Sequence, residues 1–111
     1  MTFIEAFETL KTDFAKHDVS AIPGHYAYQF NITGDGEGTF YVELKDGELN
    51  ICPYDYHDRD AEFTASFEIF QAMAKGEADA VNEYLKGRLK VGGSIDKALK
   101  LKEFIKKPKK K

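Results

Sequence analysis

The feature that most constrains this fold is a set of segments between residues 25 and 67 in which every second side chain is apolar. A period of two is that of a β-strand with one buried face. The Asp46-Gly47 pair joins two of these segments and is typical of a tight hairpin turn. A sheet with one apolar face is expected to be covered on one side only, as an antiparallel or mixed sheet in an α+β domain. The segments are HYAYQFNI from His25, TFYVEL from Thr39, the run with Leu49 and Ile51, and AEFTASF from Ala61.

Helical periodicity precedes and follows these strands. Thr2 and Glu5 fit a capping box, which predicts the start of a first helix. A fifth strand, RLKV, and a turn at Gly92-Gly93 are expected before a final helix with Ser94 as its N-cap. We therefore expect five strands with helices on one face. The helices are expected through Phe3, Phe7, Leu10 and Phe14, from Phe67 to Gly76, from Val81 to Leu85 before Gly87, and from Ser94 to Lys107.

Charge is distributed unevenly along the chain. Residues 1–86 hold 6 Lys/Arg and 17 Asp/Glu, whereas residues 87–111 hold 10 Lys/Arg and 2 Asp/Glu. The net charge of the whole chain is -3. We expect one domain over residues 1–107 and a basic tail over residues 108–111. The tail either aids solubility or draws the protein to anionic membranes, and the acidic remainder disfavours nucleic acid. The cations expected at a membrane are Lys106, Lys107, Lys109, Lys110 and Lys111.

Compartment and redox state are also constrained. Cys52 is the single cysteine, so an internal disulfide is excluded. The N-terminal MTFIEAFETLK is acidic and amphipathic, unlike a signal peptide. No apolar run approaches the roughly 20 residues that a membrane-spanning helix needs. These observations predict a cytoplasmic protein.

Catalytic and metal-binding motifs are weak. TGDGEG, from Thr33, is interpreted as a hairpin turn because no helix follows it. ICPYDYHDRD contains Cys52 and His57, but it lacks the CxxC or HxxxH spacing of metal sites and is interpreted as a solvated loop. We expect no cofactor, no metal and no catalytic residue. An enzyme that uses Cys52 with His57 is the less favoured alternative.

The final helix carries an unusually wide apolar arc, which spreads over roughly 220° at 100° per residue. A stripe that only contacts a sheet is narrower, so part of this surface is expected to make a second contact. A fuller core, a dimer interface and a bound apolar ligand each account for it. The arc consists of Ile95, Ala98, Leu99, Leu101, Phe104 and Ile105.

The segment from Ala61 to Phe104 resembles the sterol carrier protein type 2 family, the nonspecific lipid-transfer proteins. The matching motifs are AEFTAS, AMAKGE, YLKGRLKVGGS and KALKL, and the upstream GTFYVELKDGE also fits, so that nearly the whole chain is covered. The resemblance is most specific at Gly76, Gly87, Leu89, Val91, Gly93 and Leu101.

This resemblance implies a five-stranded sheet and helices around an apolar tunnel that carries lipid without transforming it. Fatty acid, fatty acyl-CoA, sterol and phospholipid are the implied ligands, and the chain lacks the peroxisomal Ser-Lys-Leu-type ending of many members. We expect Arg88, Gly92 and Gly93 near a lipid headgroup. A protein-interaction or dimerisation module with a filled core is the alternative function. The residues expected to face lipid are Phe67, Phe70, Met73, Val81, Tyr84, Leu85, Leu99, Leu101 and Phe104.

Overall fold

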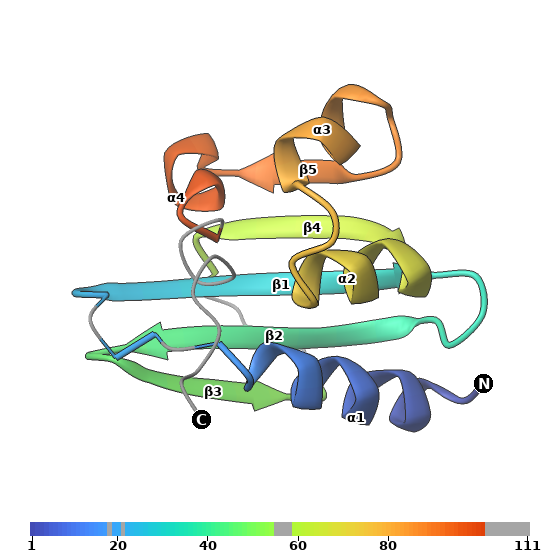
Figure 1. The fold of residues 1–111 in the computed structure, drawn as a ribbon, viewed down its shortest axis with the longest axis horizontal. Coiled ribbons are helices and arrows are strands. Elements are labelled where there is room, and N and C mark those ends of the chain that lie inside the picture. Colours follow the sequence, from blue (N-terminus) through green and yellow to red (C-terminus); the bar gives the residue numbers. More distant parts are fainter. Residues whose placement is uncertain (18, 21, 55–58, 102–111) are drawn as a thin grey trace.

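The computed structural model describes residues 1–17, 19–20, 22–54 and 59–101. Figure 1 shows helices α1 and α2 lying across one face of the sheet, with α3 and α4 beside β5 at one edge. The elements are α1 (Phe3–Phe14), β1 (His25–Thr33), β2 (Gly38–Lys45), β3 (Glu48–Cys52), β4 (Ala61–Ser66), α2 (Phe67–Ala74), α3 (Ala80–Leu85), β5 (Lys90–Gly93) and α4 (Ile95–Leu99).

The strands form one five-stranded mixed sheet in the order β3-β2-β1-β4-β5. Strand β1 pairs with β2 antiparallel and with β4 parallel, and the two outer pairs are antiparallel. Phe30 of β1 lies opposite Phe40 of β2 on one side and Phe63 of β4 on the other. The structure therefore confirms the predicted five-stranded sheet with helices on one face.

Phe30 lies at the centre of the core between the sheet and the first two helices. Its ring centroid is 5.1 Å from the centroids of Phe40, Phe63 and Phe70. The ring of Phe14 in α1 is 5.4 Å away. All five side chains are buried. Aromatic rings thus fill this part of the interior, and an enclosed tunnel stays a prediction.

The capping box at the N-terminus of α1 is confirmed. Thr2 Oγ1 accepts a hydrogen bond from the Glu5 main-chain nitrogen over 3.1 Å, and Glu5 Oε1 accepts one from the Thr2 main-chain nitrogen over 2.7 Å. This second hydrogen bond is the main reason that the pKa of Glu5 lies below its usual value. Ser94 is the predicted N-cap of α4, because its Oγ accepts from the Lys97 main-chain nitrogen.

One predicted boundary near the C-terminus needs correction, and a second lies outside the described residues. Gly92 and Gly93 are expected to form a turn, but they are the last residues of β5 and pair with Glu62 and Ala61 of β4. The final helix is expected to run from Ser94 to Lys107; α4 covers Ile95–Leu99, and the predicted end at Lys107 is not tested. The expected remainder, which includes Phe104, Ile105 and the basic tail, lies outside the described residues.

The opposite face of the sheet is polar, as the alternation predicts. Asn31 Nδ2 donates hydrogen bonds to Glu62 Oε2 over 2.7 Å and to Thr64 Oγ1 over 3.1 Å. Asn31 Oδ1 accepts hydrogen bonds of 3.0 Å from Gln29 and Thr39. Gln29 is nonetheless buried, so this face is not uniformly exposed to solvent.

Candidate functional site

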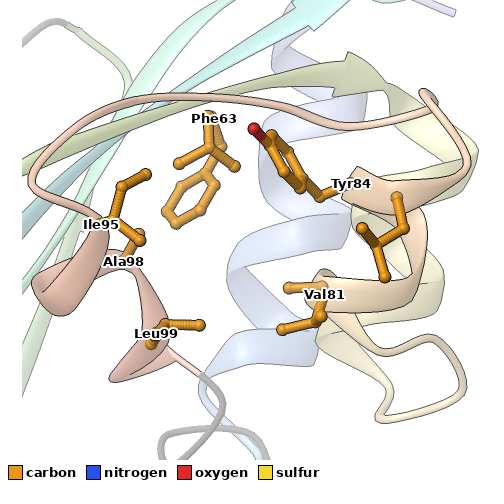
Figure 2. Close-up of a pocket in the computed structure, with 9 residues that line it drawn as sticks. Phe63, Val81, Tyr84, Ile95, Ala98 and Leu99 are labelled. Atoms are coloured by element: carbon orange, nitrogen blue, oxygen red, sulfur yellow. The ribbon is translucent and has the colours of Figure 1, made fainter.

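An apolar cavity of about 240 Å³, here called the α3–α4 pocket, lies between the β4–β5 edge of the sheet and helices α3 and α4. Figure 2 shows Val81 and Tyr84 on one side, Ile95 and Leu99 on the other, and Phe63 between them. The Tyr84 hydroxyl is the single polar side-chain group among the lining residues described. The pocket is lined by Phe63, Ala80, Val81, Tyr84, Leu85, Val91, Ile95, Ala98 and Leu99.

Helix α3 forms one wall because Val81, Tyr84 and Leu85 recur at helical spacing and share one side. Glu83 is on the other side, where it is buried and accepts hydrogen bonds of 2.6 Å and 3.0 Å from the Arg88 guanidinium. These hydrogen bonds hold the pKa of Glu83 below its usual value and raise that of Arg88.

The turn that follows α3 is fixed through the main chain as well. The carbonyl oxygen of Glu83 accepts hydrogen bonds from the main-chain nitrogens of Arg88 over 2.9 Å and Leu89 over 3.2 Å. Gly87 takes a φ of +79°, which an L-residue rarely adopts. Side-chain and main-chain contacts thus hold α3 and the start of β5 in one orientation.

Helix α4 forms the facing wall and is tied to the sheet at two points. The Tyr28 hydroxyl on β1 donates a hydrogen bond of 2.6 Å to the Lys97 main-chain oxygen. The Asp60 main-chain oxygen accepts from the Ser94 nitrogen over 2.9 Å, and its carboxylate lies 3.8 Å from Lys97 Nζ. Gly93 makes this approach possible, because a Cβ there would lie 2.7 Å from the Asp60 oxygen.

The pocket has a closed floor and an open mouth. Phe63 and Ala98 are buried at the floor, whereas Tyr84, Leu85, Ile95 and Leu99 are exposed to solvent. Such a lining can hold an alkyl group through burial and dispersion, which require no directional partner.

The structure brings together four of the nine residues expected to face lipid, namely Val81, Tyr84, Leu85 and Leu99. It places Phe67, Phe70, Met73 and Leu101 in the buried core, and none of these four is among the lining residues described. Phe104 lies outside the described residues.

Five lining residues are absent from the expected set. Ile95 and Ala98 belong to the wide apolar arc of the final helix, and Val91 is in the apolar phase of the fifth strand, so local signals existed for them. Phe63 is likewise in the apolar phase of the fourth strand, whereas Ala80 carries no such signal, because only the tertiary arrangement places it at the pocket.

The residues expected near a headgroup have other contacts. Arg88 is bonded to Glu83, and Gly92 and Gly93 belong to the β4–β5 ladder. Their headgroup role stays a prediction.

The alternative Cys52–His57 pair is not tested, because His57 lies outside the described residues. Cys52 is partly buried beside Tyr41, and a hydrogen bond to Cys52 together with burial raises the pKa of Tyr41.

Within the described ranges, no group of three or more His, Cys, Asp or Glu residues is placed to hold a metal ion. In the same part of the chain, no helix is long and apolar enough to cross a membrane.

A second cavity, of about 300 Å³, lies between the end of α1 and strand β3. Its lining mixes polar groups, including Lys11, His17 and Ser20, with Leu49 and Ile51. His17 is buried, and its Nε2 contacts the main-chain oxygen of Ala74. An alkyl group would meet more polar surface here than in the α3–α4 pocket.

Comparison with known proteins gives concordant matches. The model of the SCP-2 sterol transfer family matches residues 5–106. Sterol carrier protein 2 from Arabidopsis thaliana is 32% identical over 97 residues, which cover 84% of this chain and 77% of that protein. Hydroxysteroid dehydrogenase-like protein 2 from Rattus norvegicus is 28% identical over 102 residues, or 91% of this chain. The chain spans 19% of the length of that rat protein.

Among solved structures, one similar fold is sterol carrier protein-2 from Aedes aegypti, described as a complex with the C16 fatty acid palmitate. The TM-score is 0.65 at 21% identity, and the match covers 98% of each chain. At this identity the likeness establishes the fold.

Proposed function

This chain belongs to the SCP-2 sterol transfer family, and on that premise we propose that it binds the apolar tail of a lipid in the α3–α4 pocket and carries it unchanged. The single observation that carries the proposal is the lining of the pocket, in which nine residues from two helices and two strands contribute one polar side-chain group. The similar fold from Aedes aegypti, described with palmitate, supports a fatty acid as ligand, and fatty acyl-CoA is the related choice that the family resemblance implies. Sterol and phospholipid are the broader alternatives.

Pocket size bears on how much of the ligand is buried. The volume of about 240 Å³ lies just below the roughly 300–1,000 Å³ of typical small-molecule pockets. Each buried methylene contributes about 0.8 kcal/mol, so even a partly buried tail gains several kcal/mol before ordering costs. We expect the walls formed by α3 and α4 to separate further when a longer tail enters.

The apolar lining also supports transport without catalysis. General acid–base chemistry needs a titratable group within hydrogen-bond reach of the reacting atom. The lining residues described offer the Tyr84 hydroxyl alone. A charged headgroup would therefore stay at the mouth of the pocket, in contact with solvent.

Two further parts of the proposal extend beyond the described residues. The basic side chains of Lys106, Lys107, Lys109, Lys110 and Lys111 are proposed to aid contact with anionic lipid surfaces. A cytoplasmic location stays a prediction from the sequence.

A second candidate function is a dimerisation or protein-interaction module of the same fold. It is favoured by one observation, the exposure of Leu85, Ile95 and Leu99 at the mouth of the pocket. Such side chains could contact a second protein instead of a lipid.

The test of lipid carriage has two readouts. Protein purified under mild conditions is extracted and the extract is examined by mass spectrometry, and displacement of a fluorescent fatty acid is measured in parallel. We expect copurified lipid and displacement at micromolar concentrations. The absence of both results would contradict the proposal, and size-exclusion chromatography of the same sample would report association between copies.

A further inference from the structure

The mouth of the α3–α4 pocket gathers most of the large hydrophobic side chains that the described part of the chain exposes. Leu85 is 74% exposed, Ile95 53%, Tyr84 51% and Leu99 48%. We call these four residues the apolar rim. They make up four of the seven large hydrophobic residues that are exposed among those described. A cluster of this kind on a small protein marks a surface that contacts another apolar phase.

The segment that carries the apolar rim is basic. Residues 84–101 hold five Lys/Arg and one Asp/Glu, whereas residues 1–83 hold five Lys/Arg and 17 Asp/Glu. Two of the five cations in this segment lie beside acids from outside it, because Arg88 pairs with Glu83 and Lys97 Nζ is 3.8 Å from Asp60. Both helices end in a Leu-Lys pair, in which Leu85 and Leu99 belong to the rim and Lys86 and Lys100 are exposed C-caps. A lysine beside a rim leucine can extend along apolar surface and place its ammonium at headgroup level.

We propose that the apolar rim is the surface through which the protein docks on anionic membranes, so that the pocket opens directly into the lipid layer. In this orientation the rim side chains enter the boundary between headgroups and acyl chains. The lysines that follow Leu85 and Leu99 meet lipid phosphates. Both contributions act together, as they do for interfacial helices that combine apolar area with cations.

The charge distribution also sets the orientation of docking. The acidic surface of residues 1–83 is repelled by an anionic membrane, while the basic segment is attracted. The molecule therefore approaches with α3 and α4 toward the lipid and with its remainder away from it.

The same charges argue against a second copy of this chain as the occupant of the rim. A two-fold contact places the same patch of both partners face to face. The exposed lysines Lys86, Lys90 and Lys100 of the two copies would then add like charge to the contact, which disfavours it.

Docking of the rim deepens the proposed function, and its connection with lipid transfer rests on that function. A tail that leaves the bilayer through a docked pocket mouth does not cross water. Exposure of the tail to water opposes transfer in proportion to the number of methylenes exposed. The rim thus supplies a dry route between membrane and pocket.

Vesicle flotation tests docking directly, without added fatty acid. The full chain is mixed with vesicles of phosphatidylcholine alone or of phosphatidylcholine with phosphatidylglycerol. We expect the protein to float with the anionic vesicles and to remain unbound with the neutral ones. Raising the salt from about 0.1 M to about 1 M shortens the screening length from roughly 10 Å to roughly 3 Å, so the bound fraction should fall several-fold.

Apolar contact is tested by the double variant Leu85→Ser with Ile95→Ser. We expect its partitioning onto anionic vesicles to fall at least tenfold. Ile4→Ser is the matched control, because Ile4 is 57% exposed but lies on α1. This control should bind like the unmodified protein, and circular dichroism of every variant checks that it folds.

Charge is tested by Lys86→Glu with Lys100→Glu, which are not among the lining residues of the pocket. We expect binding to anionic vesicles to fall at least fivefold. Lys45→Glu, at the exposed end of β2, is the matched control and should change binding less than twofold.

Several outcomes would overturn the inference. They are equal binding to neutral and anionic vesicles, a loss in Ile4→Ser as large as in the rim variant, and a dimer in solution that the rim variant dissociates. Loss of binding on neutralising the lysines of residues 106–111, with the rim variants unaffected, would assign docking to the tail instead.

Fatty-acid displacement without vesicles reports the proposed function separately. If the protein floats with vesicles but binds no fatty acid, docking stands and the proposed function fails. If it binds fatty acid but does not float, docking alone is rejected.

Discussion

The hydroxyl of Tyr28, on the central strand, donates a hydrogen bond of 2.6 Å to the main-chain oxygen of Lys97 in α4. This contact joins residues 69 positions apart in the chain and connects one wall of the pocket to the middle of the sheet. The position of that wall therefore depends on a side chain that is itself outside the pocket lining described above.

Removal of this hydroxyl should loosen the wall. Tyr28→Phe is expected to lower the free energy of unfolding by about 1 kcal/mol, the typical contribution of one hydrogen bond. The affinity for a fluorescent fatty acid should also fall, by a few-fold. Urea denaturation and displacement measure the two effects, and Tyr54→Phe, which removes a hydroxyl that contacts Tyr41 and is not among the pocket's lining residues, serves as the control for binding. Unchanged unfolding and binding in Tyr28→Phe would show that the contact is not needed.

Filling the pocket should block the ligand. Ala98→Phe places a ring at the buried floor of the pocket. Fatty-acid affinity is expected to fall at least tenfold, because about two methylenes of the ligand tail would no longer be buried. Ala15→Phe is the matched control, since Ala15 lines the second cavity. If Ala15→Phe weakened binding and Ala98→Phe did not, the ligand would belong to the second cavity.

The two neighbouring glycines of β5 should respond differently to alanine. Gly93 has a φ of +83°, and an added Cβ would lie 2.7 Å from the Asp60 oxygen, so Gly93→Ala should destabilise the protein by roughly 2–3 kcal/mol. Gly92 has open space around it, and Gly92→Ala should change stability by less than about 1 kcal/mol. Thermal unfolding of both variants gives the comparison. Equal losses would contradict the close approach of Asp60 to β5.

The Glu83–Arg88 ion pair should make stability depend on pH. Because Arg88 lowers the pKa of Glu83, the carboxylate stabilises the folded state fully above the unfolded value of about 4.3. This contribution is lost as the pH falls through the lower pKa of the folded protein. Urea denaturation from neutral to acid pH should show that Glu83→Gln is less stable than the unmodified protein at pH 7 and that the difference shrinks in acid.

Glu5 gives a matched control for that experiment. Its pKa is also lowered, by its hydrogen bond in the capping box, but it lies at the start of α1. Glu5→Gln should therefore reduce the acid dependence of stability and leave fatty-acid affinity unchanged, whereas Glu83→Gln should weaken binding because α3 loses an anchor. Equal effects of both variants on binding would show that the ion pair does not position the wall.

Local signals were sufficient for most of the fold. Alternation across β1 and β2, the Asp46-Gly47 turn and the capping box of Thr2 and Glu5 depend on residues close together in the chain, and the structure contains all of them. The Gly92-Gly93 segment was interpreted wrongly because its strand conformation depends on pairing with β4, some 30 residues earlier.

The candidate site was only partly accessible from the sequence for a similar reason. Periodicity shows that Phe70 and Met73 share an apolar face with helical spacing, and the same is true of Val81 and Tyr84. It does not show that the first pair contacts the sheet, whereas the second faces a cavity. That difference is decided by the distance of each helix from the sheet, which no local pattern records.

The parallel pairing of β1 with β4 has a consequence for the order of assembly. Tyr28 lies opposite Ala61 and Thr33 opposite Ser66, so this ladder closes loops of 33 residues, whereas β1 and β2 are joined by a short hairpin. The N-terminal hairpins are expected to form early and to serve as the template on which β4, β5 and α4 dock last. The half of the molecule that encloses the pocket would then also be the first to detach, and its amide hydrogens should exchange with solvent sooner than those of β1 and β2.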